Sequence, residues 1–242
     1  MKRGNDAVLD WPEKPRRRTR RVGRQVRPGV FFFALTIVAL VTVPVLAPPA
    51  SAHPHAWIDL RSTVLLDQRG RIIGIEQEWP FDDFYTLFVI EGANQSGVDQ
   101  KTALAEVTKT NLENLRAFNY FTEARLDDRN LNFNNVEEYE SELRGGRLWM
   151  RFVVPLSSAV DASAARFSFA VYDPTYYVEI LHLKGDIVAF RGSSASQCYG
   201  QIVSPKPTTE AFLLAQAVDQ DMNPDNTLGR IFAEQVFVSC RR

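Results

Sequence analysis

The sequence has few of the residues on which enzyme motifs depend. Its 242 residues include three histidines and two cysteines. It has no Gly-x-Ser-x-Gly turn, no His-Glu-x-x-His helix and no phosphate-binding glycine loop, which argues against the common hydrolase and nucleotide-binding classes. It also lacks the long alternation of strand and helix that a two-lobed solute-binding protein needs. We therefore expect a protein that is not an enzyme.

The basic residues are concentrated at the start of the chain. Residues 1–29 contain ten Lys and Arg but three acidic residues, and residues 30–46 contain no charged side chain. The small residues Ala50-Ser51-Ala52 follow, and this three-part order is typical of a secretory signal peptide. We expect cleavage after Ala52, which leaves residues 53–242 as a periplasmic domain. An uncleaved anchor is the alternative, because the apolar run is close to the ~17 residues that span a bilayer, and the leader is the only contact with the membrane that we expect.

Removal of residues 1–52 changes the charge of the protein. The leader holds ten of the 28 basic residues and three of the 29 acidic residues, so the remaining chain has a net charge of about −8. A negative charge of this size argues against nucleic acid as a partner.

Both cysteines, Cys198 and Cys240, lie in the expected periplasmic part. Thiol pairs become disulfides in an oxidising compartment, and a bond that closes a loop of this length stabilises a fold by roughly 3 to 4 kcal/mol. The alternative is a pair of metal-binding thiolates, but two cysteines so far apart are a poor zinc signature. We expect a Cys198–Cys240 disulfide.

The periodicity of apolar residues predicts an α+β fold, mostly an antiparallel β-sheet or sandwich. Two helices are inserted after the first hairpin, one with Asp82 as N-cap and Gly92 as its end and one over residues 101–118. Two short helices near the C-terminus begin after Thr208 or Thr209 and at Thr227. The sequence predicts hairpins between the first two strands, at Gly145-Gly146, and between residues 176–183 and 187–191. The expected strands are residues 56–67, 71–79, 121–126, 136–143, 147–155, 166–172, 176–183, 187–191, 199–203 and 235–240.

Two histidines directly follow the expected cleavage point. Cleavage after Ala52 makes His53 the first residue, so that an α-amine and the imidazoles of His53 and His55 lie within a few residues of one another. Such nitrogens suit a late first-row transition metal. Pro54 has no N–H and cannot supply the deprotonated amide of a square-planar site, so further ligands must come from elsewhere. The alternative is an exposed tail that binds no metal.

Four other residues could complete a metal site. His182 is the third histidine, and the carboxylates of Asp59, Asp82 and Asp83 lie close in sequence to the first hairpin. Nitrogen and carboxylate ligands suit zinc, nickel, cobalt or copper better than magnesium or calcium. A half-buried, hydrogen-bonded strand residue is the alternative for His182.

Four segments of the chain resemble the domain of unknown function 1007 family. They are the segments His53-Pro54-His55-Ala56-Trp57-Ile58-Asp59, Trp79-Pro80-Phe81-Asp82-Asp83-Phe84-Tyr85, Asn119-Tyr120-Phe121-Thr122 and Tyr172-Asp173-Pro174-Thr175-Tyr176-Tyr177. The last segment is either a simple turn with core tyrosines or a carboxylate and phenol cluster at a ligand cleft. The resemblance implies a periplasmic component of an ABC-type transport system, associated with nickel, cobalt or zinc.

Three functions follow from these observations. The first is a periplasmic accessory protein that binds a divalent metal and passes it to an inner-membrane metal transporter or ABC permease. The second is a copper enzyme that uses an N-terminal histidine chelate. The third is a metal-free, β-rich domain that docks on a transporter.

Overall fold

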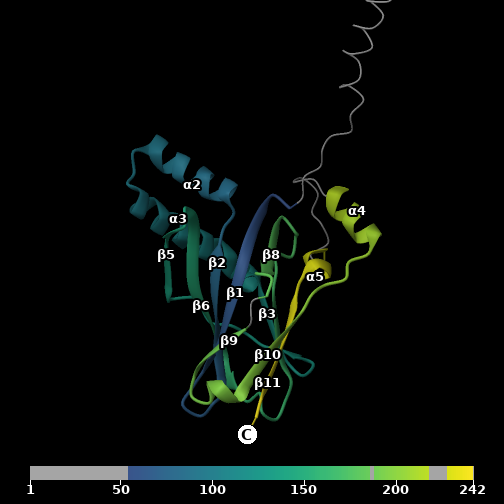
Figure 1. The fold of residues 1–242 in the computed structure, drawn as a ribbon. Coiled ribbons are helices and arrows are strands. Elements are labelled where there is room, and N and C mark those ends of the chain that lie inside the picture. The colour runs from purple at the N-terminus through teal and green to yellow at the C-terminus, as the bar shows by residue number, and fades with distance from the viewer. Residues whose placement is uncertain (1–53, 186–187, 218–227, 242) are drawn as a thin grey trace, which may run out of the picture. The chain divides into compact units, whose positions relative to one another are not determined.

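The computed structural model describes residues 54–185, 188–217 and 228–241. These residues form two mostly antiparallel sheets and four α-helices, which confirms the α+β prediction (Figure 1). None of the helices in these ranges has the length and apolarity needed to cross a membrane. The expected leader and His53 lie outside the described residues.

The first sheet is organised around a long strand, β1. Its strand order is β5-β6-β2-β1-β8, and β9 also pairs with β1. Its strands are β1 (Ala56–Leu66), β2 (Ile72–Pro80), β5 (Tyr139–Arg144), β6 (Arg147–Val160), β8 (Val178–His182) and β9 (Ala189–Gly192). The β5–β6 hairpin turns at Gly145 and Gly146, which have φ angles of 58° and 84°. A β-branched or bulky residue is strained at such angles, so the predicted glycine turn is confirmed.

The predicted hairpin between residues 176–183 and 187–191 is wrong. Both segments pair with β1, and both run parallel to it. β8 pairs with residues 56–60 and β9 with residues 63–66, so the eleven-residue β1 accommodates the two short strands one after the other. Two strands that run in the same direction along one edge cannot form a hairpin.

The second sheet is antiparallel, with the order β10-β11-β7-β3-β4. Its strands are β3 (Thr122–Leu126), β4 (Arg129–Asn130), β7 (Phe167–Val171), β10 (Cys198–Val203) and β11 (Gln235–Cys240). Cys198 lies directly opposite Cys240 in the β10–β11 ladder, and the two are joined by a disulfide. The predicted bond is confirmed.

The apolar faces of the two sheets pack against each other to form the core. One buried cluster draws on both sheets, and its fully buried members include Val64, Ile75 and Phe152 from the first sheet and Phe167 and Phe169 from the second. The alternation of buried and exposed residues along β1 follows the predicted pattern.

The described residues contain four α-helices. They are α2 (Asp83–Ser96), α3 (Gln100–Leu115), α4 (Thr209–Ala217) and α5 (Leu228–Phe232), and a 3₁₀-helical turn (Arg116–Phe121) follows α3. The predicted end of the first helix at Gly92 is wrong, because α2 continues to Ser96 and ends at Gly97 in the left-handed conformation. Val89 and Ala93 are buried on either side of Gly92, and this packing outweighs the ~1 kcal/mol that an internal glycine costs a helix.

A buried carboxylate joins three strands of the first sheet. Glu76 of β2 is 4% exposed and receives hydrogen bonds from Arg151 of β6 and from Arg191 of β9. Burial alone would raise the pKa of Glu76, but the hydrogen bonds from Arg191 and Arg151 hold its pKa below the usual 4.5. An unpaired carboxylate at this position would be costly.

We expect Glu76→Gln to lower the free energy of unfolding by about 2 kcal/mol at pH 7. This is less than the roughly 3 to 5 kcal/mol of a fully buried pair, because the Arg191 side chain is 55% exposed. Glu140→Gln is the control, since Glu140 contacts the same Arg151 from an exposed position and should change stability by less than about 0.5 kcal/mol.

The difference between the wild type and Glu76→Gln should depend on pH. A carboxyl group whose pKa is lowered by folding contributes stability above its unfolded pKa and loses it as the pH falls through the folded value. Urea unfolding at pH 7 and at pH 3 should therefore show a smaller difference at pH 3. An equal difference at both values would contradict the assigned role of the carboxylate.

Candidate functional site

The start of β1 is tied to the start of α2 by one carboxylate. Asp82 Oδ2 accepts a hydrogen bond from the backbone N–H of Trp57 at 2.9 Å, and its Oδ1 accepts one from the N–H of Tyr85 at 2.9 Å. The N–H of Asp82 in turn donates to the carbonyl of Trp57. Asp82 is thus the predicted N-cap of α2 and also the anchor of β1. Both carboxylate oxygens accept backbone hydrogen bonds, so Asp82 has a structural role here.

Four of the predicted metal ligands lie at this end of β1. The backbone N–H of His55 donates to the carbonyl of Tyr177, and the two rings lie 4.6 Å apart. Asp83 is exposed at the first position of α2, next to Asp82. Asp59 lies further along β1 and forms an ion pair with Arg147 at 2.6 Å. His55 and Asp83 are therefore both exposed near the start of β1 and of α2, whereas Asp59 and Asp82 make structural contacts.

His182 lies elsewhere, on the inner face of β8. Its Nδ1 is 2.8 Å from Glu234 Oε2, and its Nε2 is 3.0 Å from Ser62 Oγ. Because a carboxylate accepts, a neutral His182 ring donates from Nδ1 and accepts the Ser62 hydroxyl at Nε2. Both ring nitrogens are engaged, so this position does not favour His182 as a metal ligand. Across the described residues, no three His, Cys, Asp or Glu side chains are arranged to hold a metal ion.

The Ser62–His182–Glu234 series has the hydrogen-bond order of a nucleophile, base and acid. Ser62, however, is 2% exposed and lies within β1, where its side chain points into the core. A nucleophile needs access to substrate and donors for the oxyanion. We therefore interpret this series as a buried link between β1, β8 and the residue that precedes β11.

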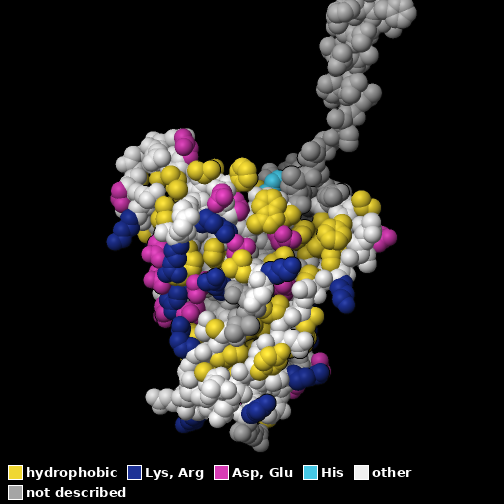
Figure 2. All heavy atoms as spheres, viewed as in Figure 1, with side chains coloured by type: hydrophobic (Ala, Val, Ile, Leu, Met, Phe, Trp, Pro, Cys, Tyr) yellow, Lys and Arg dark blue, Asp and Glu magenta, His cyan; other side chains and the backbone are white. Residues whose placement is uncertain are grey.

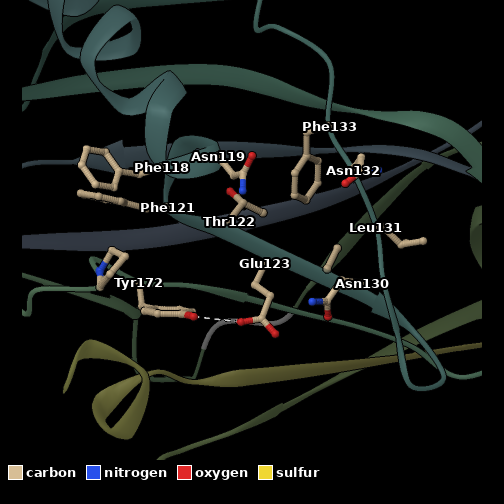
Figure 3. Close-up of a pocket in the computed structure, with 12 residues that line it drawn as sticks. Phe118, Asn119, Phe121, Thr122, Glu123, Asn130, Leu131, Asn132, Phe133 and Tyr172 are labelled. Atoms are coloured by element: carbon tan, nitrogen blue, oxygen red, sulfur yellow. Dashed lines mark hydrogen bonds between the residues drawn. The ribbon is translucent and has the colours of Figure 1, made fainter. Parts of the chain in front are cut away.

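A cavity opens beside the second sheet, next to β3 (Figure 3). Its volume is about 360 Å³. The turn before β3, the strand itself, the chain after β4 and the segment after β7 form its walls. The lining residues are Phe118, Asn119, Phe121, Thr122, Glu123, Ala124, Asn130, Leu131, Asn132, Phe133, Tyr172 and Pro174. The Tyr172 hydroxyl donates to Glu123 Oε2 at 2.9 Å, and Arg230 of α5 donates to the same oxygen.

The turn that forms one wall has an unusual backbone. Asn119, Tyr120 and Phe121 have φ angles of 52°, 56° and 56°, and each left-handed residue other than glycine costs roughly 1 kcal/mol or more. The surroundings hold them in place, because Tyr120 is buried and its hydroxyl accepts a hydrogen bond from the N–H of Val136. Strain of this kind is concentrated at functional sites. The sequence predicted a helix up to residue 118 and a strand from residue 121, with no strained turn between them. Among Asn119, Tyr120 and Phe121, only Asn119 is of a type that readily adopts the left-handed conformation.

The segment Tyr172–Tyr177 divides between two roles. Asp173 is 4% exposed, and its carboxylate accepts hydrogen bonds from the N–H groups of Thr175 and Val178, so it stabilises a turn. Tyr172 lines the cavity, whereas Tyr177 contacts His55. Asp173 and the tyrosines of this segment therefore do not line one shared cleft.

The four segments noted in the sequence form one connected body. Tyr177 contacts His55, Asp82 bonds Trp57, and the rings of Trp79 and Phe121 stack at 6.4 Å. The N–H of Tyr172 donates to the carbonyl of Phe121.

Comparison with known proteins supports the family resemblance of these four segments. Residues 38–240 match the family described as protein of unknown function (DUF1007). The chain belongs to this family. An uncharacterized protein of Haemophilus influenzae is 27% identical over 192 residues, which cover 78% of this chain and 91% of the relative. An uncharacterized 15.5 kDa protein in the trpE 3′ region of Spirochaeta aurantia is 29% identical over 98 residues, which cover 40% of this chain and 69% of the relative.

We expect Asp82→Ala to lower the free energy of unfolding by about 1 to 2 kcal/mol, because it removes a helix cap and leaves the Trp57 amide without its carboxylate. Amide hydrogen exchange should accelerate at Trp57. The exposed neighbour provides the control, since Asp83→Ala should change stability by less than about 0.5 kcal/mol. Unchanged exchange at Trp57 in Asp82→Ala would show that another contact holds β1 in place.

Proposed function

We propose that this protein is exported to the periplasm and that its cleaved form binds a divalent transition metal at its N-terminus, as an accessory protein of a transport system. The observation that carries the proposal is the position of His55. The hydrogen bonds between Trp57 and Asp82 hold the start of β1 against the start of α2. His55 lies two residues before Trp57, and the exposed Asp83 directly follows Asp82.

The ligand set follows from this position. Cleavage after Ala52 supplies the α-amine and the imidazole of His53, His55 adds a second imidazole, and Asp83 supplies a carboxylate. Two imidazoles, an amine and a carboxylate suit zinc, nickel, cobalt or copper. His182, Asp59 and Asp82 have structural partners and serve to hold the fold instead.

A surface for a partner lies directly beside this site. Phe84, Leu87 and Phe88 of α2 are 80%, 62% and 76% exposed. Their i, i+3, i+4 spacing places them on one side of the helix, and Figure 2 shows hydrophobic side chains gathered over α2. An apolar groove of about 370 Å³ between α2 and α3 continues this surface. Exposed apolar patches mark interaction sites, and the partner we propose is an inner-membrane metal transporter or ABC permease.

Metal binding can be tested by isothermal titration of the exported, purified protein with Zn²⁺, Ni²⁺, Co²⁺ and Cu²⁺. At least one metal should bind with a stoichiometry of one. The double variant His53→Ala, His55→Ala should lose the binding, and Asp83→Asn should weaken it about tenfold, as for the loss of one ligand bond. Asp128→Asn, an exposed acid in the β3–β4 turn, serves as the control.

N-terminal sequencing of the same material establishes the cleavage point. Metal binding by the wild type that equals that of the double variant would contradict the metal proposal. A product that retains its leader would contradict it as well. Peroxide-dependent turnover with bound copper would favour the copper enzyme instead.

Docking can be tested by placing a photo-crosslinking amino acid at Leu87 or at Tyr199 in cells. Tyr199 is similarly exposed, at 65%, but lies on β10 of the other sheet. We expect a crosslink to an inner-membrane permease from Leu87 and not from Tyr199. The double variant Phe84→Ser, Phe88→Ser should abolish the crosslink.

A crosslink that persists after chelation favours the metal-free docking domain. Equal labelling from both positions would contradict the proposal that α2 forms the docking surface.

A further inference from the structure

The cavity beside β3 has two kinds of wall. Figure 3 shows the rings of Phe118, Phe121 and Tyr172 on one side of the labelled residues and the ring of Phe133 on another. Polar side chains lie between these rings, which are therefore separated by groups that can hydrogen-bond. Mixed apolar and polar walls of this kind orient a ligand, and the volume of about 360 Å³ falls within the range of small-molecule sites.

The charge inside the cavity is balanced. Glu123 is the single carboxylate in its lining, and its Oε2 accepts hydrogen bonds from the Tyr172 hydroxyl and from Arg230, which lies outside the lining. Because the guanidinium compensates the carboxylate, the walls offer no net charge to a ligand. Both hydrogen bonds fall on Oε2, which leaves Oε1 as an acceptor. A cation or an anion would gain little here, so a neutral ligand fits best.

The polar capacity of the cavity is high for its size. Asn119, Asn130 and Asn132 each contribute a side-chain amide with donors and an acceptor. Within the described part of the chain, these three amides form no hydrogen bond to another residue. Polar groups that the fold does not use remain available to a ligand that carries several hydroxyl or amide groups.

The geometry of one wall is fixed before any ligand arrives. The left-handed backbone of Asn119, Tyr120 and Phe121 is held by the buried Tyr120 and by the Thr122 hydroxyl, which donates to the carbonyl of Tyr120. The amide of Asn119 and the ring of Phe121 therefore project from a constrained turn. A constrained wall reduces the ordering cost of binding.

We propose that this cavity binds a neutral saccharide. Aromatic faces contact the C–H faces of a sugar ring, and the amides with Glu123 Oε1 match its hydroxyl groups. A hydrocarbon would contact the aromatic walls but make no hydrogen bond with the amides. This site is separate from the metal site proposed at the N-terminus, since no residue of that site lines the cavity.

The test is titration of the exported protein with glucose, galactose, N-acetylglucosamine and chitobiose, with a chelator present so that metal binding plays no part. Saturation-transfer NMR and calorimetry should detect at least one of these sugars with a dissociation constant of about 1 mM or tighter. Asn132→Ala, which alters an exposed side chain and leaves the fold intact, should weaken binding about tenfold. Phe133→Ala should weaken it similarly, and Asn135→Ala, an exposed asparagine outside the lining, should not.

Two results would overturn the proposal. One is that none of the four sugars binds. The other is that the sugars bind equally to the wild type, Asn132→Ala and Phe133→Ala, which would place them elsewhere. Tetramethylammonium and L-phenylalanine serve as competing probes, and displacement of a bound sugar by either one would show a site for cations or aromatic amino acids instead.

Discussion

The pairing of β1 sets the positions of nearly every residue discussed above. One edge of the strand pairs with β2, and the other pairs with β8 and then with β9. This register sends Ile58, Leu60 and Ser62 into the core and leaves Trp57 and Asp59 on the outer face. A shift of one residue would exchange the two faces. Such a shift would bury Asp59, move the Ser62 hydroxyl away from the His182 ring and break the hydrogen bond between Trp57 and Asp82.

The residues with the most reactive side chains are largely used to hold this arrangement. Asp82 caps α2 and anchors β1, Asp59 pairs with Arg147, and His182 lies between Ser62 and Glu234. The surfaces that remain available are of another kind: aromatic and amide groups in the cavity beside β3, and an apolar side of α2.

Local patterns in the sequence predicted the local structure well. Alternation gave β1 and β2, paired glycines gave the β5–β6 turn, and the two cysteines gave the bond between β10 and β11. What failed depended on distant contacts. The extension of α2 past Gly92 requires packing of Val89 and Ala93, and the parallel placement of β8 and β9 requires the length of β1. The ion pairs of Glu76 and the cavity around Glu123 join residues far apart in the chain, and no local spacing indicates them.

The parallel contact between β1 and β8 also affects how the chain folds. Leu60 lies opposite His182, more than a hundred residues later, and the second sheet takes its β11 strand from the C-terminal end of the chain. Contacts between such distant segments require the closure of large loops, which slows folding. The edge of β1 that pairs with β8 and β9 therefore stays unpaired until residues up to 192 have been made, although β2 follows β1 directly in the chain.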